Sequence, residues 1–448
     1  MDNSSNNMDL SIIISKINQF KESNETVGSK ELLKEIFSDI ISIHEKSIIP
    51  KQIKLKSITL PGLIDVHVHV REPGHEYKED WRTCTMAALA GGITMIFAMP
   101  NTKPSVVDYE SFELVNNIAK QKALCDYGLY FGANNTNAQE IPEYSDKACA
   151  LKMYLNTTYR DLKLDNTLVW EQQFKHWNKD KPICVHAEGM TLVAVLSYAF
   201  IYDRHVHVCH ISSEEEITIV KNYKDLIKKY KENDRDINMR ITCEVSPHHL
   251  FLDKNNIEDN DFALVKPPLS SLKSHNTINK YRNINSMFGK ESGIISKDRQ
   301  ALWDNLDIID CFATDHAPHL VNDKVNKKCP GFPGLETALP LLLTAVDNGL
   351  LTIDDIILRY HTNPKKIFGI SDQPNTSVEI CMDQWVIPKS TKYTKCNWTP
   401  FEGMKVTGRV LKTTLRDNLL YSYNLSDGSS DIYDNYQGTN VFWDESDE

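Results

Sequence analysis

The 448-residue chain has no apolar run long enough to cross a lipid bilayer. Its uninterrupted apolar stretches, such as Met95–Met99 and Leu192–Leu196, are only a few residues long. A membrane-spanning helix needs about 20 residues. The first seven residues, Met-Asp-Asn-Ser-Ser-Asn-Asn, contain no basic and apolar leader for secretion. We therefore expect no membrane partner.

The sequence also lacks any C-x-x-C pair, although it contains ten cysteines. Scattered single cysteines suit neither a small disulfide scaffold nor a zinc ribbon. Several lie in apolar runs, where a free thiol behaves as a small hydrophobic group. This usage favours a reducing compartment, and we expect a cytoplasmic protein.

Positive charge is in deficit, with 50 Lys and Arg against 61 Asp and Glu and a formal net charge of -11. Eight of the acidic residues, and no Lys or Arg, lie between Asp417 and Glu448, and without those eight the net charge would be about -3. A nearly neutral body offers no broad basic face, so we expect no nucleic-acid partner.

Changes in composition along the chain predict three regions. Residues 1–48 are predicted to be a helical or disordered extension, because polar residues are followed by apolar ones at helical spacing. Residues 49–366 form the main domain, with a Ser-, Asn- and Lys-rich loop inserted at 270–297. Residues 367–448 are interpreted as a β region that ends in an acidic tail. We expect the extension and the tail to serve docking or solubility.

The main domain contains eight short apolar runs with helical segments between them. This alternation predicts an α/β fold, a (β/α)8 barrel of parallel strands, although the strand count alone leaves open a doubly wound sheet. The runs are Leu60–Val70, Ile93–Met99, Tyr127–Phe131, Ala148–Leu155, Pro182–His186, Val206–Ile211, Arg240–Val245 and Ile308–Ala313.

Polar residues at the ends of these runs favour the barrel. In a barrel the carboxyl ends of all strands meet at one face, where barrel enzymes place their chemistry. An open sheet would spread the same residues over a wide crevice. The residues are His67, His69, Asn101, Lys152, His186, His210, Glu244 and Asp315.

Four of these histidines point to a metal centre. In Asp65-Val-His67-Val-His69 the alternation places both imidazoles on one side of a strand. The alternative is that these are unrelated histidines of the core, since the chain has fifteen histidines and His205-Val-His207 repeats the spacing. With His186, His210 and Asp315 at other strand ends, four imidazoles and a carboxylate predict zinc.

Lys152 stands in the otherwise apolar run Ala-Leu-Lys-Met-Tyr-Leu. An unpaired buried ammonium is costly, so one interpretation has the side chain extending out of the barrel end. The other has the amine deprotonated and carboxylated by carbon dioxide, which would make it an anionic ligand shared by two metal ions.

Several motifs together resemble the dihydroorotases, and most closely the dihydroorotase domain of the animal-type multifunctional pyrimidine-synthesis protein. The resemblance runs from about Leu55 to Gly408. It rests on Pro61–Gly74, Gly91–Thr102, Leu151–Asn156, Thr242–Phe251, Ala313–His319 and Pro330–Thr337.

The resemblance implies an amidohydrolase-type barrel with two zinc ions. One ion would be held by His67, His69 and Asp315 and the other by His186 and His210, with N6-carboxylated Lys152 between them. Cys209 and Glu244 are implied candidates for a third zinc, although strand alternation would point Cys209 away from His210.

The implied reaction is the reversible cyclisation of N-carbamoyl-L-aspartate to dihydroorotate in pyrimidine synthesis. Asp315 would be the acid and base. The implied substrate contacts are Arg71, whose fork can clamp a carboxylate, together with Asn101, Thr158, His319 and Lys266. Lys266 stands where the animal-type pattern has Arg, which keeps the charge but loses the fork.

The resemblance also implies a homodimer and leaves open association with other pyrimidine-pathway enzymes. Two alternatives remain. An allantoinase or dihydropyrimidinase would keep the histidines and Lys152 but would not need Arg71 for a substrate carboxylate. A non-catalytic scaffold is disfavoured because all six metal positions are filled.

Overall fold

The computed structural model describes residues 57–157, 160–233, 237–257, 261–271 and 295–443. The predicted N-terminal extension, Thr158 and most of the inserted loop lie outside the described residues. Contacts within the chain divide it into two units, Met1–Lys56 and Ser57–Glu448. The fold described below belongs to the second unit.

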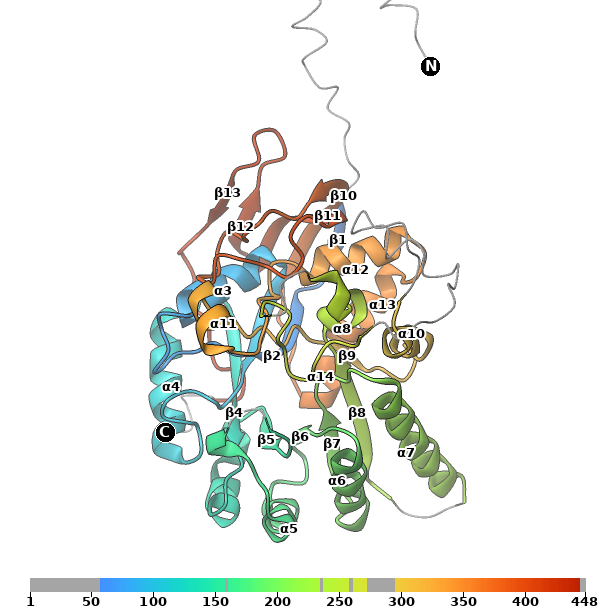
Figure 1. Ribbon diagram of the computed structural model, residues 1–448. Helices are drawn as coiled ribbons and strands as arrows, with labels where there is room; N and C mark the ends of the chain where they lie inside the picture. The colour runs from blue at the N-terminus through green and yellow to red at the C-terminus, as the bar shows by residue number, and fades with distance from the viewer. Residues whose placement is uncertain (1–56, 158–159, 234–236, 258–260, 272–294, 444–448) are drawn as a thin grey trace, which may run out of the picture. The chain divides into compact units, whose positions relative to one another are not determined.

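Eight parallel strands form one sheet in sequence order from β2 to β9 (Figure 1). A parallel bridge between Val68 and His316 brings the eighth strand beside the first, and the N–H of His69 donates to the carbonyl of His316 at 2.8 Å. The sheet is thus a nearly closed barrel, which confirms the predicted fold. The strands are β2 (Leu63–Val68), β3 (Ile93–Ala98), β4 (Asp126–Gly132), β5 (Ala150–Tyr154), β6 (Ile183–His186), β7 (His205–Val208), β8 (Arg240–Val245) and β9 (Cys311–Phe312).

Helices cover the outside of the barrel. Those with clear start signals have capping boxes, as at Asp80 with Thr83 and at Ser213 with Glu216. The α-helices are α3 (Trp81–Ala90), α4 (Tyr109–Lys122), α5 (Thr167–His176), α6 (Met190–Ile201), α7 (Glu214–Glu232), α8 (Pro247–Phe251), α10 (Lys297–Asp304), α11 (Val321–Lys327), α12 (Ala338–Asp347), α13 (Ile353–Ile357) and α14 (Asn363–Phe368). The 3-10 turns are η1 (Asn137–Gln139), η2 (Ile141–Lys147), η3 (Arg160–Leu162) and η4 (Lys254–Asn256), and η6 (Leu358–Thr362) is a π-helix.

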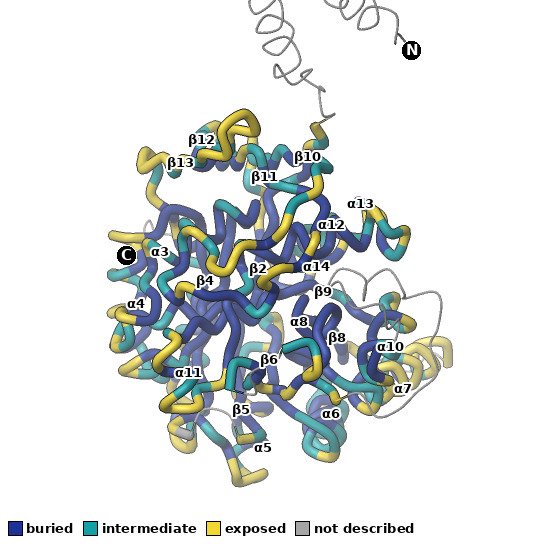
Figure 2. Tube along the Cα trace, turned by 45° about the horizontal axis from the view of Figure 1, so that its top comes forward, coloured by how far each residue is buried: buried dark blue, intermediate teal, exposed yellow. Residues whose placement is uncertain are grey.

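Burial explains why the apolar runs became strands. Every residue of β2 through β7 is buried, as expected for parallel strands with helices outside and side chains filling the interior. The buried segments accordingly lie at the centre in Figure 2. Among the described residues, none of the helices combines the length and apolar character needed to span a bilayer.

A second, antiparallel sheet flanks the barrel. Its order is β1 (Ile58–Leu60), β10 (Ser377–Val386), β11 (Lys405–Leu415), β12 (Asn418–Tyr423) and β13 (Ser430–Ile432). Because β1 pairs with β10, with Ile58 opposite Ile380, the sheet joins the segment before the barrel to the segment after it.

The acidic tail packs against the rest of the second unit as far as Trp443, the last residue that the structure describes. The N–H of Val441 donates to the carbonyl of Tyr127 at 3.0 Å. The ring of Phe442 lies 5.5 Å from that of Phe97, whose side chain belongs to the barrel interior, and Trp443 stacks on Phe112 at 5.8 Å. Phe442 and Trp443 therefore contribute to the packing, while the docking or solubility role expected for the acidic tail stays a prediction.

Candidate active site

The predicted metal-binding side chains come together at the carboxyl ends of the barrel strands. His67, Lys152 and Glu244 lie within β2, β5 and β8, His186 ends β6, and the others follow the ends of strands within three residues. All are buried, and the most accessible, His69, is only 8% exposed. The strand ends thus form one compact polar cluster above an apolar interior.

His67, His69 and Asp315 form one side of the cluster. The Nε2 atoms of His67 and His69 lie 3.3 and 3.2 Å from the same Oδ1 atom of Asp315. Nδ1 of His69 lies 2.7 Å from the amide oxygen of Asn101 and can donate to it. That bond leaves the Nε2 lone pair directed into the cluster, as a metal-ligating imidazole requires.

His186 and His210 form the other side. Nδ1 of His186 lies 2.9 Å from Nε2 of His210, and the donor atoms of His67, His210 and Asp315 all lie within 4.8 Å of one another. The two sides are therefore continuous. Nδ1 of His210 is buried with no hydrogen-bond partner among the described residues.

Lys152, Cys209 and Glu244 line the floor of the cluster. Nζ of Lys152 donates to Sγ of Cys209 at 2.8 Å. The Glu244 carboxylate bonds to Nδ1 of His67 through one oxygen and lies 3.0 Å from Nε2 of His207 through the other. His67, Cys209 and Glu244 form a second group whose donor atoms lie within 4.8 Å.

The alternation argument against Cys209 does not hold at this position. β7 ends at Val208, so residues 209 and 210 are no longer in a strand, and His210 has φ of 35°. Cys209 and His210 consequently both approach His67. Strand periodicity applies only as far as the strand extends.

Burial sets the charge state of the imidazoles. It lowers the pKa of His67, His69, His186 and His210, so they are neutral near pH 7, the form that ligates metals. Burial would raise the pKa of Glu244, but the neighbouring His67 and His207 outweigh it, and the net pKa is lowered. Glu244 is therefore a carboxylate.

The pKa of the bare Lys152 amine is raised, whereas carboxylation requires a deprotonated amine. Burial lowers its pKa, but Cys209 and Glu244 more than offset that effect, and the net pKa is raised. The protein groups alone thus favour the ammonium ion. Burial raises the pKa of the Cys209 thiol, and the neighbouring Lys152 offsets part of that effect.

Three residues of the candidate site lie in strained backbone. Arg71, His210 and Asp315 have φ angles of 72°, 35° and 47°, a region that costs a residue with a side chain on the order of 1–3 kcal/mol. Such strain persists where the surrounding structure imposes it, and each residue here follows a barrel strand.

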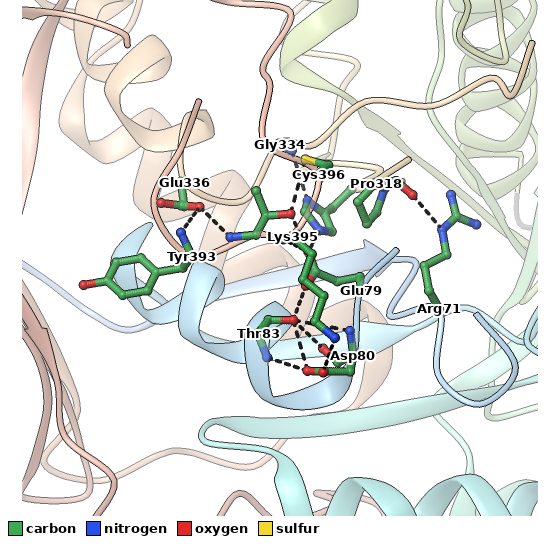
Figure 3. Close-up of polar contacts among 12 residues, drawn as sticks. Arg71, Glu79, Asp80, Thr83, Pro318, Gly334, Glu336, Tyr393, Lys395 and Cys396 are labelled. Carbon is green, nitrogen blue, oxygen red and sulfur yellow. Dashed lines mark hydrogen bonds and ion pairs between the residues drawn. The ribbon is translucent and has the colours of Figure 1, made fainter. Parts of the chain in front are cut away.

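Arg71 and His319 form a basic corner beside the cluster. Nε of Arg71 donates to the carbonyl of Pro318 at 3.2 Å, as Figure 3 shows, and its Nη2 atom lies 3.1 Å from Nε2 of His319. Asn101 contacts His69 on the metal-binding side, and the charge of Arg71 helps to lower the pKa of the same imidazole, after the larger effect of burial. Lys266 is exposed, and its charge helps to lower the pKa of Glu188, after the larger effect of the hydrogen bond from His186.

The sequence interpretation missed several residues that support the site. Glu188 contacts His186 at 3.2 Å, His207 holds Glu244, and Lys78 lies 3.2 Å from Nδ1 of His319. Only His207 gave a signal, because it repeats the His-x-His spacing of the first strand. The other contacts arise between segments that the sequence does not show to be neighbours.

The donor set fits divalent metal ions. It offers imidazole nitrogen, carboxylate oxygen and a thiol, the ligand types that zinc takes in proteins. The buried, unpartnered Nδ1 of His210 is the kind of polar atom that a metal ion would satisfy. The fold and these side chains together define a barrel hydrolase of the metal-binding type.

Comparison with known proteins supports the same class of protein. The model of the Amidohydrolase family matches residues 58–374. Dihydroorotase from Pyrococcus furiosus is 34% identical over 375 residues, which cover 81% of each chain. The chain therefore belongs to the amidohydrolase family, among its dihydroorotases.

Higher identity is found with larger proteins. Multifunctional protein CAD of Squalus acanthias is 47% identical over 370 residues, and multifunctional protein pyr1-3 of Dictyostelium discoideum is 45% identical over 369 residues. Each match covers 82% of this chain but only 15% of the larger protein.

Solved structures share the fold. The inactive dihydroorotase-like domain of a Chaetomium thermophilum CAD-like multifunctional protein superimposes with a TM-score of 0.66 at 27% identity, over 86% of this chain and 99% of that domain. An L-hydantoinase from Arthrobacter aurescens gives 0.69 at 21% identity, over 81% and 85% of the two chains. At that identity the second likeness concerns the fold alone.

Proposed function

We infer that the protein is a dihydroorotase, which interconverts N-carbamoyl-L-aspartate and dihydroorotate in pyrimidine biosynthesis. The observation that carries this inference is the basic corner of Arg71 and His319, which lies close enough to the buried ligand cluster for the charge of Arg71 to act on His69. The substrate needs both features, since it carries a carboxylate on the same ring as the amide that reacts.

We propose that His67, His69, His186, His210 and Asp315 hold two zinc ions, with Lys152 carboxylated between them and Cys209 and Glu244 as ligands of a third. Zinc in these positions would supply a Lewis acid for the ring carbonyl and an activated water. The raised pKa of bare Lys152 means that its carboxylation depends on the ions, because the protein groups alone keep the amine protonated.

Asp315 is the residue that moves the proton. In hydrolysis its carboxylate takes a proton from the attacking water and returns it to the ring nitrogen that leaves. In synthesis the steps reverse. Synthesis also consumes a proton overall, because one carboxylate of carbamoyl aspartate becomes a ring carbonyl, so acid conditions favour cyclisation and alkaline conditions favour hydrolysis.

The substrate's carboxylate would be bound by Arg71, Asn101 and His319. Arg71 offers the planar fork that matches a carboxylate. We propose Thr158 and Lys266 as further contacts. We further propose cytoplasmic homodimers that associate with other pyrimidine-pathway enzymes, as the likeness to multifunctional proteins suggests, with residues 1–48, 49–366 and 367–448 as three regions.

Two measurements test the function together. Zinc content is determined beside dihydroorotate hydrolysis, and Asp315→Asn is compared with Asp310→Asn, a carboxylate that bonds to Lys224 instead. Loss of proton transfer should lower turnover of Asp315→Asn in both directions by at least ~10²–10⁴-fold, while Asp310→Asn stays near normal. Normal turnover by Asp315→Asn would remove the assignment. Zinc-loaded protein without turnover would favour the scaffold alternative.

A further inference from the structure

Lys78 makes an unusual contact for a lysine. It lies between β2 and α3, is only 8% exposed, and places Nζ 3.2 Å from Nδ1 of His319. Asp323 of α11 lies behind it, with Oδ2 3.7 Å from the same nitrogen. The proposed mechanism uses His319 but assigns no role to Lys78 or Asp323.

The contacts of His319 determine which ring nitrogen carries the hydrogen. An ammonium group has donors and no acceptor, so Nδ1 must accept from Lys78. Nε2 lies 2.9 Å from the carbonyl oxygen of Pro330, which can only accept, so Nε2 must carry the hydrogen. Two contacts on opposite sides of the ring thus require the same Nε2–H tautomer.

In this tautomer the one hydrogen on Nε2 goes to the carbonyl of Pro330, so Nε2 has no lone pair for the side that faces Arg71. Nη2 of Arg71 is a donor and lies 3.1 Å from Nε2. Two donors at that separation cannot bond to each other, so Nη2 of Arg71 can donate to an ionised carboxylate, which only accepts. In the opposite tautomer Nε2 would accept from Arg71, and this internal bond would compete with the substrate.

We propose that Lys78, held by Asp323, is a positioning residue that keeps His319 in the Nε2–H tautomer, so that His319 does not accept from Arg71 and the fork of Arg71 is directed to the substrate's carboxylate. The proposal rests on the proposed function for the identity of that carboxylate. Burial and the nearby charges of Arg71, Lys78 and Lys324 lower the pKa of His319, which is consistent with a neutral ring.

The experiment reads the tautomer directly. Protein labelled with ¹⁵N-histidine is examined by long-range ¹H–¹⁵N correlation NMR, with the His319 ring assigned from a His319→Gln sample. Wild type should show hydrogen on Nε2. Lys78→Met, which keeps the length of the side chain but removes the donor, should show hydrogen on Nδ1 or a mixture of tautomers.

Kinetics with dihydroorotate give the second readout. Lys78→Met should raise KM by ~10- to 100-fold, the range for a hydrogen bond to a charged group, with a smaller change in kcat. Lys78→Arg, which keeps a cationic donor, should restore the Nε2–H tautomer and recover most of the KM. Lys327→Met is the matched control, since Lys327 pairs with the same Asp323 at 2.7 Å and is mostly exposed.

Each outcome decides the proposal. A pure Nε2–H tautomer with unchanged KM in Lys78→Met would overturn it, and so would an equal effect in Lys327→Met. If Lys78→Met does not fold, Asp323→Asn replaces it and must shift the tautomer in the same direction. Absence of dihydroorotate turnover in wild type would overturn the proposed function instead, while the NMR result, which needs no turnover, would still decide the role of Lys78.

Discussion

Arg71 is the side chain that separates the proposed function from that of other cyclic-amide hydrolases. Arg71→Ala should weaken the binding of dihydroorotate and carbamoyl aspartate by ~2–4 kcal/mol, the scale for removing one partner of a desolvated charge pair. Arg71→Lys should recover only part of the loss, because the fork is absent. Binding is measured by calorimetry.

The control for Arg71 is Arg82→Ala. Arg82 pairs with Asp434 at 2.6 Å on the exposed surface, so its removal should leave the affinity for both ligands unchanged. If Arg71→Ala binds both compounds as wild type does, Arg71 has a structural role only, and the allantoinase-type alternative becomes the better one.

Lys152 gives a test that separates charge from chemistry. Lys152→Arg keeps the charge of the bare amine, but Arg stays protonated and cannot form the carbamate. We expect loss of zinc by elemental analysis and loss of turnover. Lys181→Arg is the control, because Lys181 donates to the carbonyl of Ala148 at 2.9 Å, away from the cluster.

Mass measurement under carbon dioxide completes the Lys152 experiment. The wild-type enzyme should carry one added carboxylate, and Lys152→Ala should regain some activity with a small carboxylic acid in excess. A fully active, zinc-loaded enzyme with an unmodified Lys152 would contradict the model of a shared carbamate ligand.

Single residues were predictable where the chain itself encodes their direction. His67 and His69 lie two apart on a strand, and the end of β2 directs both toward Asp315. Lys78 and Glu188 could not be found in this way. Their partners depend on how connecting segments fold back over the barrel, and no periodicity specifies that.

At the level of elements, α11 connects the strand-end residues to the segment that follows them. Lys324 on this helix is fully buried and donates to the carbonyls of Leu264 and Gly331. Its Nζ atom also lies 5.1 Å from the ring centre of Phe332. Lys324 thereby links the segment that contains Lys266 to the one that supports His319.

The buried ammonium of Lys324 predicts a pH effect on stability. Burial lowers its pKa to about 7, whereas the unfolded value is about 10.4. Between these values the unfolded chain binds more protons, so this group makes the free energy of unfolding rise as the pH increases from about 7 to 10. Lys324→Met should lose that part of the slope in urea titrations.

The contribution of Lys324 is the difference in the free energy of unfolding between wild type and Lys324→Met at each pH, since other groups titrate in the same range. Wild type and Lys324→Met are compared at pH 7, 8, 9 and 10. Parallel curves would contradict the assigned pKa. Lys328→Met serves as the control because Lys328 is exposed and pairs with Asp261.

The elements themselves were largely predictable from burial. All eight apolar runs became strands because parallel strands bury both faces and so read as continuous apolar segments. Short helices such as α8 and α11 were not expected, since five to seven residues carry too little periodicity. Their existence depends on packing against the rest of the barrel.

At the scale of the whole molecule, the region after the barrel supports the site. Nε1 of Trp398 donates to the carbonyl of His319 at 2.7 Å. In Figure 3, Glu336 accepts from the N–H of Tyr393, and Lys395 reaches Asp80 at the start of α3. These bonds tie the C-terminal region to the segments that carry Arg71 and His319.

The two ends of the chain are expected to differ in their contribution to stability, and two truncations test this difference. Removing residues 437–448 deletes Phe442 and Trp443 from their packing against Phe97 and Phe112. By analogy with the loss of aromatic side chains from a core, and because these two are only partly buried, we expect stability to fall by roughly 2–4 kcal/mol. Removing residues 1–45 takes away no residue of the described unit, Ser57–Glu448, and should leave both stability and turnover unchanged.

Denaturant unfolding and steady-state kinetics distinguish the two truncations. The C-terminal truncation should retain near-normal KM at low temperature, because no proposed site residue lies beyond His319, and should lose activity at lower denaturant concentration than wild type. Equal stability after that truncation would show that the segment from Gln437 to Trp443 contributes nothing to the packing of the barrel. A large loss of turnover after the N-terminal truncation would instead assign residues 1–45 a part in the reaction, which would contradict the confinement of the chemistry to the barrel.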